Sequence, residues 1–182
     1  MKVYLIGCHG AGKSTLARYI SKQHSLPFLT ETVRKVLSER ELNIDAIRHD
    51  LDVIDSFQQE VFDRQMAEEK KYTEFVSDRS ALDALAYSSQ HTRILPKLLR
   101  SAELVSYISD LKKPDVRIFF VRPLRVAIKP DGVRETLTYD GIIQIDTIVK
   151  FLLEMYELPH FIINTDSMQE RVKLIDSVIL AK

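Results

Sequence analysis

Residues 7–14 read Gly7-Cys8-His9-Gly10-Ala11-Gly12-Lys13-Ser14, which is the spacing G-x-x-x-x-G-K-S. A β-branched and aromatic run precedes this stretch at 2–6, and a helical pattern follows it at 14–20, so we expect a loop between a strand and a helix. Three of the five glycines in the chain lie in this loop. Glycines allow successive backbone N–H groups to turn toward one anion without interference from side chains. The stretch therefore predicts a phosphate-binding loop, in preference to an ordinary strand-to-helix turn.

The residues that close this loop predict what it binds. Lys13 is expected to neutralise charge between the β- and γ-phosphates of ATP, and the Ser14 hydroxyl is expected to ligate magnesium. The N-terminus of the following helix adds a partial positive charge. ATP and Mg²⁺ are thus the predicted cofactors. Cys8 and His9 occupy variable positions of the pattern, where we expect them to be tolerated and not catalytic. The predicted cofactor-binding residues are Gly7, His9, Gly10, Ala11, Gly12, Lys13, Ser14, Thr15 and Arg122.

Composition narrows the class of protein. A length of 182 residues predicts a single domain over 1–182, and no segment approaches the run of about eighteen apolar residues that spans a membrane. Lys plus Arg equals Asp plus Glu at 26 each, so the chain lacks the positive field that helps to hold a long polyanion, and a small substrate is favoured. A single cysteine excludes an internal disulfide. With no recognisable signal peptide, we expect a cytoplasmic protein of undetermined oligomeric state.

The remaining pattern alternates strands with helices. Helices are expected over 50–72 and over 80–110 with a break at Pro96, and a late helix should bury a face that ends at Met155. A final helix should run along Met168, Val172, Ile175 and Ile179. This alternation predicts an α/β fold with a parallel sheet and helices on both faces. With the phosphate-binding loop after the first strand, the expected strand order is 2-3-1-4-5. The five strands are expected at 2–6, 27–30, 74–78, 115–121 (buried on both faces at its end) and 161–164.

Two acids stand where predicted strands end, on the side of a parallel sheet where ligands bind. Asp78 follows the third strand and could hold magnesium together with Ser14, while Arg79 could bind the transferred phosphate. The alternative is that Asp78 is a helix N-cap with a solvated Arg79. Glu31 follows the second strand, and its alternative is an intrahelical ion pair with Arg34.

Residues 122–141 break the periodic pattern with Pro123, Pro130, Gly132 and Gly141 among mixed charges. We expect this segment to be a lid that closes over bound phosphates. Arg122, directly after a buried strand, and Arg134, just past a predicted turn, are the cations favoured for binding phosphate. Either of them could instead be a surface charge.

Together, these motifs resemble the nicotinamide-riboside-kinase-like P-loop proteins, which are ATPases and kinases of NAD and nucleotide metabolism. The resemblance covers nearly the whole chain and rests on 7–14, Glu31 with Arg34, 77–80 with Asp83 and Tyr87, and 131–134. A more distant similarity to deoxynucleoside kinases implies that Glu31 accepts the proton of the substrate hydroxyl. Residues 52–64 do not match a nicotinamide-binding pattern, so the resemblance does not extend to the substrate. The predicted catalytic residues are Lys13, Glu31, Asp78, Arg79 and Arg134, and the predicted metal ligands are Ser14 and Asp78.

The favoured function is an ATP- and magnesium-dependent transfer of phosphate to a nucleoside, a nucleoside monophosphate or a similar small molecule. One alternative is a kinase that acts on a polynucleotide end or on a modified base in DNA, which the neutral net charge disfavours. A second alternative is a nucleotide-dependent regulatory ATPase. Such a switch needs a residue that positions water and a partner surface, and the sequence identifies neither.

Overall fold

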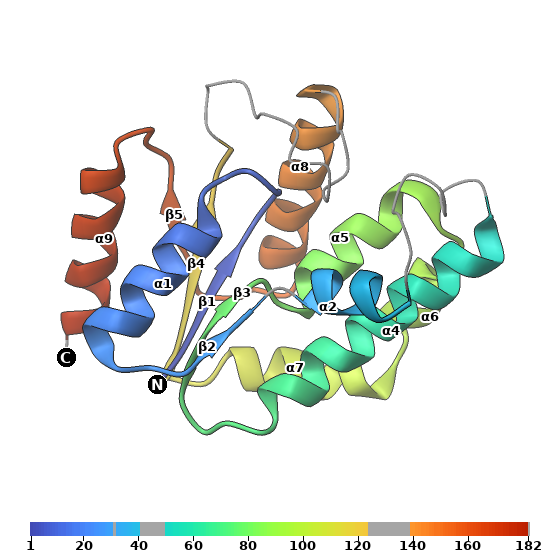
Figure 1. Cartoon of the computed structure of the whole chain (residues 1–182), viewed down its shortest axis with the longest axis horizontal. Coiled ribbons are helices and arrows are strands. Elements are labelled where there is room, and N and C mark those ends of the chain that lie inside the picture. Colours follow the sequence, from blue (N-terminus) through green and yellow to red (C-terminus); the bar gives the residue numbers. More distant parts are fainter. Residues whose placement is uncertain (31, 41–49, 124–138, 182) are drawn as a thin grey trace.

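The computed structural model describes residues 1–30, 32–40, 50–123 and 139–181, which form a five-stranded parallel sheet between two layers of helices (Figure 1). The strand order is β2-β3-β1-β4-β5, which confirms the predicted topology and the α/β fold of a P-loop kinase. Each strand is close to its expected position, and only β2 is much shorter. The strands are β1 (Lys2–Ile6), β2 (Phe28–Leu29), β3 (Phe75–Asp78), β4 (Val116–Val121) and β5 (Phe161–Ile163).

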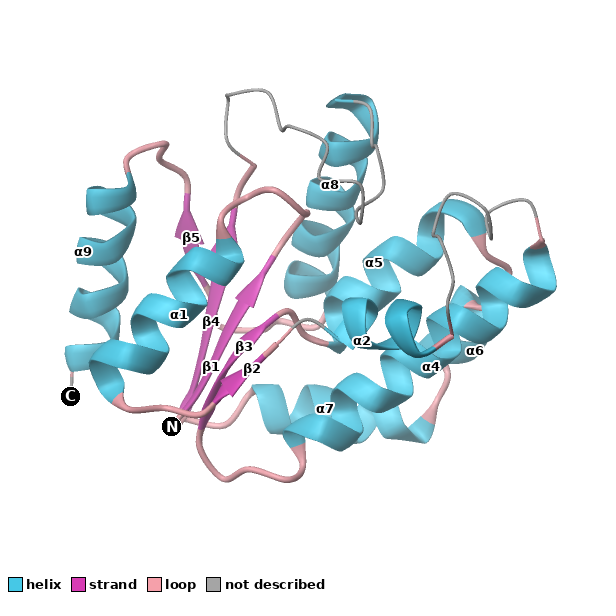
Figure 2. Ribbon diagram, in the orientation of Figure 1, coloured by secondary structure: helices cyan, strands magenta, loops and turns pink. Residues whose placement is uncertain are grey.

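Helices cover both faces of this sheet (Figure 2). On one face lie α1 (Lys13–His24) and α9 (Met168–Leu180), and the remaining helices lie on the opposite side (Figure 1). Within the described ranges, none of the helices combines the length and the apolar character needed to cross a membrane. The helices of the second side are α2 (Thr32–Glu39), α4 (Leu51–Glu69), α5 (Ala81–His91), α6 (Leu95–Leu99), α7 (Ala102–Leu111) and α8 (Tyr139–Met155).

The core is centred on β1 and β4, which are neighbours in the middle of the sheet. The last four residues of β4, from Ile118 to Val121, are almost completely inaccessible to solvent, which confirms the prediction that this strand is buried on both faces. Burying one side chain of this size stabilises the fold by about 2 kcal/mol. The sheet is therefore a rigid base for the loops at its carboxyl edge.

The predicted helix over 80–110 with one break at Pro96 is wrong. Three helices occupy this stretch, and Pro96 lies in the first turn of α6. A proline is well tolerated there because the first backbone N–H groups of a helix have no partner within the helix. The chain leaves helical geometry at Thr92 and again near Ser101, which caps α7.

Two further expectations needed correction at the C-terminal part of the chain. The segment 122–141 does not remain irregular to its end, because α8 already begins at Tyr139, and 124–138 lie outside the described residues. Met155 was expected on the buried face of α8, and Met168 on that of α9. Their exposed fractions are 44% and 41%, so neither belongs to the core. The buried face of α8 does include Ile145 and Leu152, as expected.

A buried hydrogen-bond network joins four elements around the carboxylate of Glu69 on α4. It accepts hydrogen bonds from Tyr4 Oη at 2.8 Å, from Gln65 Nε2 at 2.8 Å and from Tyr107 Oη at 3.1 Å. Tyr107 Oη also accepts from the backbone N–H of Ala81, at the start of α5, at 3.3 Å. Burial raises the pKa of Glu69 from its ordinary 4.5 to about 7, although the three donors oppose this shift.

The free energy of unfolding of the wild-type protein is expected to fall as the pH rises from about 5 to about 7. Glu69→Gln is expected to abolish this fall. The folded state holds the Glu69 proton more tightly than the unfolded state, so deprotonation disfavours folding by up to about 3 kcal/mol. Urea unfolding followed by far-UV circular dichroism at several pH values would measure this difference. The matched control is Glu68→Gln, because a hydrogen bond from Lys71 lowers the pKa of Glu68 and moves its titration below this range. Equal pH slopes for wild type and Glu69→Gln would contradict the expectation.

Candidate active site

The parallel pairing of β1 and β3 brings the predicted loop and the predicted acid together. Leu5 of β1 pairs with Asp78 at the end of β3, and the backbone N–H of Arg79 donates to Leu5 O at 3.0 Å. At this carboxyl edge of the sheet lies a cavity of about 230 Å³. Its lining joins the loop to the end of β3, and the residues are His9, Gly10, Gly12, Lys13, Ser14, Thr15, Arg18, Asp78 and Arg79.

The loop begins at Gly7, where only glycine fits. A Cβ atom at this position would lie 2.4 Å from the carbonyl oxygen of Val121, closer than real Cβ contacts come. Its φ of +134° is also a conformation that other residues rarely adopt. The Gly7 N–H donates to Asp83 Oδ1 at 2.9 Å, so a buried side chain of α5 fixes the entry of the loop. Gly7 shapes the loop from behind and does not line the cavity.

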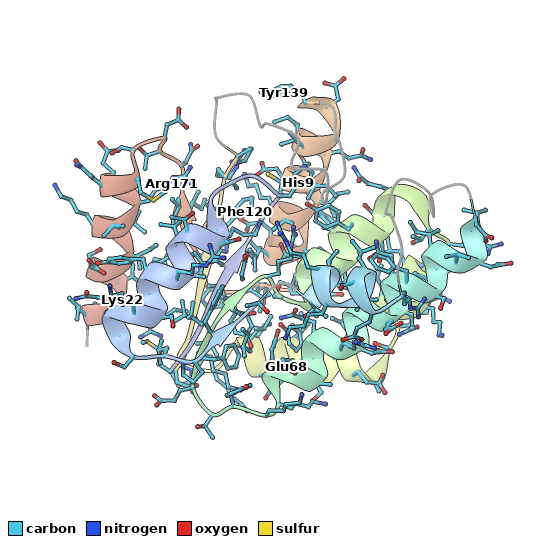
Figure 3. All side chains as sticks on the ribbon, in the orientation of Figure 1. His9, Lys22, Glu68, Phe120, Tyr139 and Arg171 are labelled. Carbon is cyan, nitrogen blue, oxygen red and sulfur yellow. The ribbon has the colours of Figure 1, made fainter. Side chains whose placement is uncertain are left out.

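The loop ends at Gly12, the N-cap of α1, with a φ of +90°. The positive end of the helix dipole is therefore directed at the cavity. Arg171 of α9 supports the loop from the other side, since its Nη1 donates to Ala11 O at 2.5 Å and its Nε donates to Thr165 O at 2.6 Å. Figure 3 shows Arg171 on the α9 side of the loop and His9 on the other side. The loop is thus held in place by side chains of α5 and α9.

Lys13 is buried within the curve of the loop. Its ammonium group donates to Gly7 O at 2.9 Å and to Cys8 O at 2.6 Å. Burial lowers the pKa of Lys13, the nearby charge of Arg79 lowers it further, and Asp78 and Asp83 oppose this effect. A buried ammonium group beside a guanidinium is a strong attractor for an anion, because little water screens it.

Ser14 and Asp78 meet although 64 positions separate them in the sequence: the Ser14 hydroxyl donates to Asp78 Oδ2. Two oxygen ligands on adjacent elements suit magnesium, which takes few protein ligands and completes its coordination with water and phosphate oxygens. The residues present therefore fit a magnesium ion held by Ser14 and Asp78. The alternative that Asp78 is a helix N-cap is wrong, because Ser80 caps α5 in a capping box with Asp83.

Arg79 has an unusual backbone conformation, with a φ of +101° that is costly for a residue with a side chain. Its guanidinium carbon lies 5.0 Å from the centre of the Tyr87 ring, and its Nη1 lies 3.8 Å from Asp83 Oδ1. Arg79 is itself largely buried and lines the cavity. Backbone strain of this kind is typical of functional sites, where the surrounding structure maintains it.

Asp83 and Tyr87 of α5 connect the loop to Arg79. Asp83 accepts hydrogen bonds from the backbone N–H groups of Gly7 and Ser80 at 2.9 and 2.8 Å. Burial raises the pKa of Asp83, while the charges of Arg79 and Lys13 oppose that rise. Tyr87 Oη accepts the backbone N–H of His9 at 2.9 Å, and burial raises the pKa of Tyr87 to about 12. The sequence motif included both residues, but their bracing contacts are visible only in the structure.

Three further residues, Arg122, Glu31 and Arg134, were expected in the site. Arg122 does not line the cavity: its Nε and Nη2 donate to the two carboxylate oxygens of Asp146 on α8, at 2.9 and 2.6 Å. Burial raises the pKa of Asp146, and the Arg122 charge opposes this rise. Glu31 and Arg134 lie outside the described residues.

One lining residue was not anticipated. Arg18 lies on α1, one turn after Ser14, and it reaches the cavity from an exposed position. A lone arginine on the polar side of a helix carries no signal in the sequence, because most such residues are only solvated. Its proximity to the loop motif was the one available clue.

The family described as an AAA domain matches residues 2–171. No curated protein shows significant sequence similarity to the chain. Among solved structures, deoxyadenosine kinase from M. mycoides, with the products dCMP and dCDP, aligns over 100% of both chains with a TM-score of 0.67 and 17% identity. NadR protein in complex with NR aligns over 100% of this chain and 51% of its own, with a TM-score of 0.75 and 12% identity. Shikimate kinase from Acinetobacter baumannii, in complex with shikimate, aligns over 99% and 93%, with a TM-score of 0.60 and 14% identity. At such identities the likeness is one of fold.

Proposed function

The chain belongs to the AAA domain family, and we propose that within it this protein is an ATP- and magnesium-dependent phosphotransferase. Its acceptor is a nucleoside, a nucleoside monophosphate or a nucleoside-like small molecule, bound beside α4. One observation carries this proposal: Lys13, Ser14, Asp78 and Arg79 line a single cavity at the N-terminus of α1. These are the groups that phosphoryl transfer requires for positioning and for charge neutralisation.

Each residue has a role that follows from its chemistry. Lys13 binds the β- and γ-phosphates, and Ser14 and Asp78 would hold the magnesium ion, which when bound neutralises phosphate charge. Arg79 presents a planar fork to the transferred phosphate, where it stabilises charge that develops in the transition state. Glu31 removes the proton when the acceptor is a hydroxyl group. Arg134 is a further cation for the phosphates.

The acceptor class is supported by the size of the cavity and by the kinds of protein that share the fold. A cavity of about 230 Å³ suits reacting groups of a small molecule, and the net charge of zero gives no general attraction for a polynucleotide. The similar structures are deoxyadenosine kinase with dCMP and dCDP, NadR with NR, and shikimate kinase with shikimate. The resemblance to nicotinamide-riboside-kinase-like proteins makes nicotinamide riboside one acceptor to test.

A screen of acceptors tests the proposal. The protein is incubated with Mg²⁺ and ATP labelled at the γ-phosphate, and with one nucleoside, nucleoside monophosphate, nicotinamide riboside or shikimate at a time. Label in a new product that depends on both the acceptor and the enzyme is the expected result. ATP hydrolysis that no acceptor changes would favour a regulatory ATPase, and label only on oligonucleotides would favour a polynucleotide kinase. Either result would refute the proposed acceptor class.

A further inference from the structure

Arg18 is the one charged residue of the cavity lining, among those the structure describes, that the proposed reaction has not used. It lies four positions after Ser14 on α1, so the two residues share one side of the helix. The Cα–Cβ bonds of a helix tilt toward its N-terminus, and a long side chain covers the preceding turn. The guanidinium of Arg18 can therefore reach the part of the cavity next to Ser14 while its backbone remains one turn away.

An aromatic ring supports this guanidinium. The Arg18 Cζ atom lies 6.0 Å from the centre of the ring of Phe28, a half-buried residue of β2. A guanidinium held over a ring loses fewer conformations when it binds, and its N–H groups remain able to donate two parallel hydrogen bonds to a phosphate or a carboxylate. Arg18 is thus partly organised for an oxyanion before one arrives.

Arg18 lies on the β2 side of the sheet, away from α9, whose Arg171 supports the loop. Phe28 and Val76 pair between β2 and β3, at the end of the sheet opposite to β5. Figure 1 shows α2 and α4 beside this end, whereas α9 lies beside β5. The proposed acceptor site is next to α4, so Arg18 stands on the acceptor side of the cavity.

The charges of the cavity indicate what the acceptor carries. The described lining residues include three cationic side chains, Lys13, Arg18 and Arg79, and one carboxylate, Asp78. The proposed reaction assigns Lys13 and Arg79 to ATP phosphates and Asp78 to magnesium. A neutral nucleoside hydroxyl has no use for a third cation, whereas a second phosphate brought close to the γ-phosphate would be strongly repelled without one.

We propose that Arg18 binds a phosphate group of the acceptor, so that the acceptor is a nucleoside monophosphate and not a nucleoside. This inference rests on the proposed function and deepens it. An ionised oxygen of the acceptor phosphate forms the new bond to the γ-phosphorus, and the bond from that phosphorus to the bridging oxygen of ADP breaks. No proton needs to be removed, because a phosphate monoester is largely ionised near neutral pH. The products are ADP and a nucleoside diphosphate.

The test compares matched acceptors. Each common ribo- and deoxyribonucleoside 5′-monophosphate and its parent nucleoside is assayed with ATP and Mg²⁺, and the products are separated by anion-exchange chromatography. Wild-type protein is expected to convert at least one monophosphate. For that monophosphate, Arg18→Gln is expected to raise KM about 10- to 100-fold, with KM for ATP unchanged and kcat nearly retained. Calorimetric titration of the same monophosphate into each protein should show the same loss of affinity.

Two control variants make the result specific. Arg18→Lys keeps the charge but not the planar fork, and it should restore part of the affinity. Lys22→Gln removes another exposed cation of α1, farther from the cavity, and should change neither KM. Both substituted positions, Arg18 and Lys22, are exposed, so the three variants should fold, as circular dichroism would verify.

Each contrary outcome identifies the assumption that fails. Conversion of nucleosides but of no monophosphate would overturn the role of Arg18 and leave the kinase intact. A rise in KM for ATP in Arg18→Gln as large as that for the monophosphate would show that Arg18 serves ATP, which also overturns the inference. Absence of transfer to every acceptor would refute the proposed function itself.

Discussion

Replacing Lys13 by alanine is expected to lower the rate of phosphoryl transfer by about a thousand-fold or more. The side chain is the buried cation at the centre of the loop, and its loss leaves the negative charge of the transferred phosphate without its nearest partner. Steady-state rates with saturating ATP and an acceptor found by screening would measure the effect.

The control for this variant has to separate activity from folding, because Lys13 also donates hydrogen bonds to the loop. Alanine removes the donor to the carbonyl oxygens of Gly7 and Cys8, so a modest loss of stability is expected along with the loss of activity. Lys13→Met retains the length of the side chain without the charge, and it separates packing from electrostatics. If Lys13→Met were folded and nearly as active as wild type, the assigned role of the ammonium group would be refuted.

Asp78→Asn is expected to lower the rate about 100-fold or more and to raise the Mg²⁺ concentration needed for half-maximal activity about 10- to 100-fold. The substitution keeps the shape and the hydrogen bond with Ser14 but removes the charge that would hold the cation. A magnesium titration of the initial rate, at saturating ATP, distinguishes this effect from a general loss of activity.

Two further variants test whether Asp78 and Ser14 act as one unit. Ser14→Ala should change the magnesium dependence in the same direction, and the double variant should lose less than the two single effects combined, because both residues would hold the same ion. Asp110→Asn removes an exposed carboxylate that pairs with Lys113, and it should alter nothing. An unchanged magnesium requirement in Asp78→Asn would show that this carboxylate serves another purpose.

Much of the fold could be predicted because its signals are local. Five apolar runs with helical patterns between them were enough to predict a parallel sheet with helices on both faces, since crossovers between parallel strands are right-handed. The strand order, which the structure confirms, was expected from the phosphate-binding loop after the first strand. The errors arose where one residue is compatible with two local structures. Pro96 can end a helix or begin one, and it begins α6. Met155 continued an apolar spacing along α8 but is exposed at the last residue of the helix.

The candidate site was predictable to the same extent. The loop, Asp78 and Arg79 were found because they follow strands, and the carboxyl ends of parallel strands meet at one edge. Arg18 was missed because nothing in its neighbours distinguishes it from a solvated arginine. The partner of Arg122 was missed because Asp146 lies 24 residues later, and only the packing of α8 against the end of β4 brings the pair together.

The amino-acid sequence by itself determined that this chain has a phosphate-binding loop, because glycines, lysine and serine must lie within one short stretch for their amides, ammonium and hydroxyl groups to surround one anion. Tertiary structure alone decided which distant groups meet there. The register of β1 and β3 brings Asp78 to Ser14, α5 holds Arg79 in a strained conformation against Tyr87, and α8 binds Arg122 away from the cavity. These pairings depend on how whole elements pack, and no short stretch of sequence contains that information.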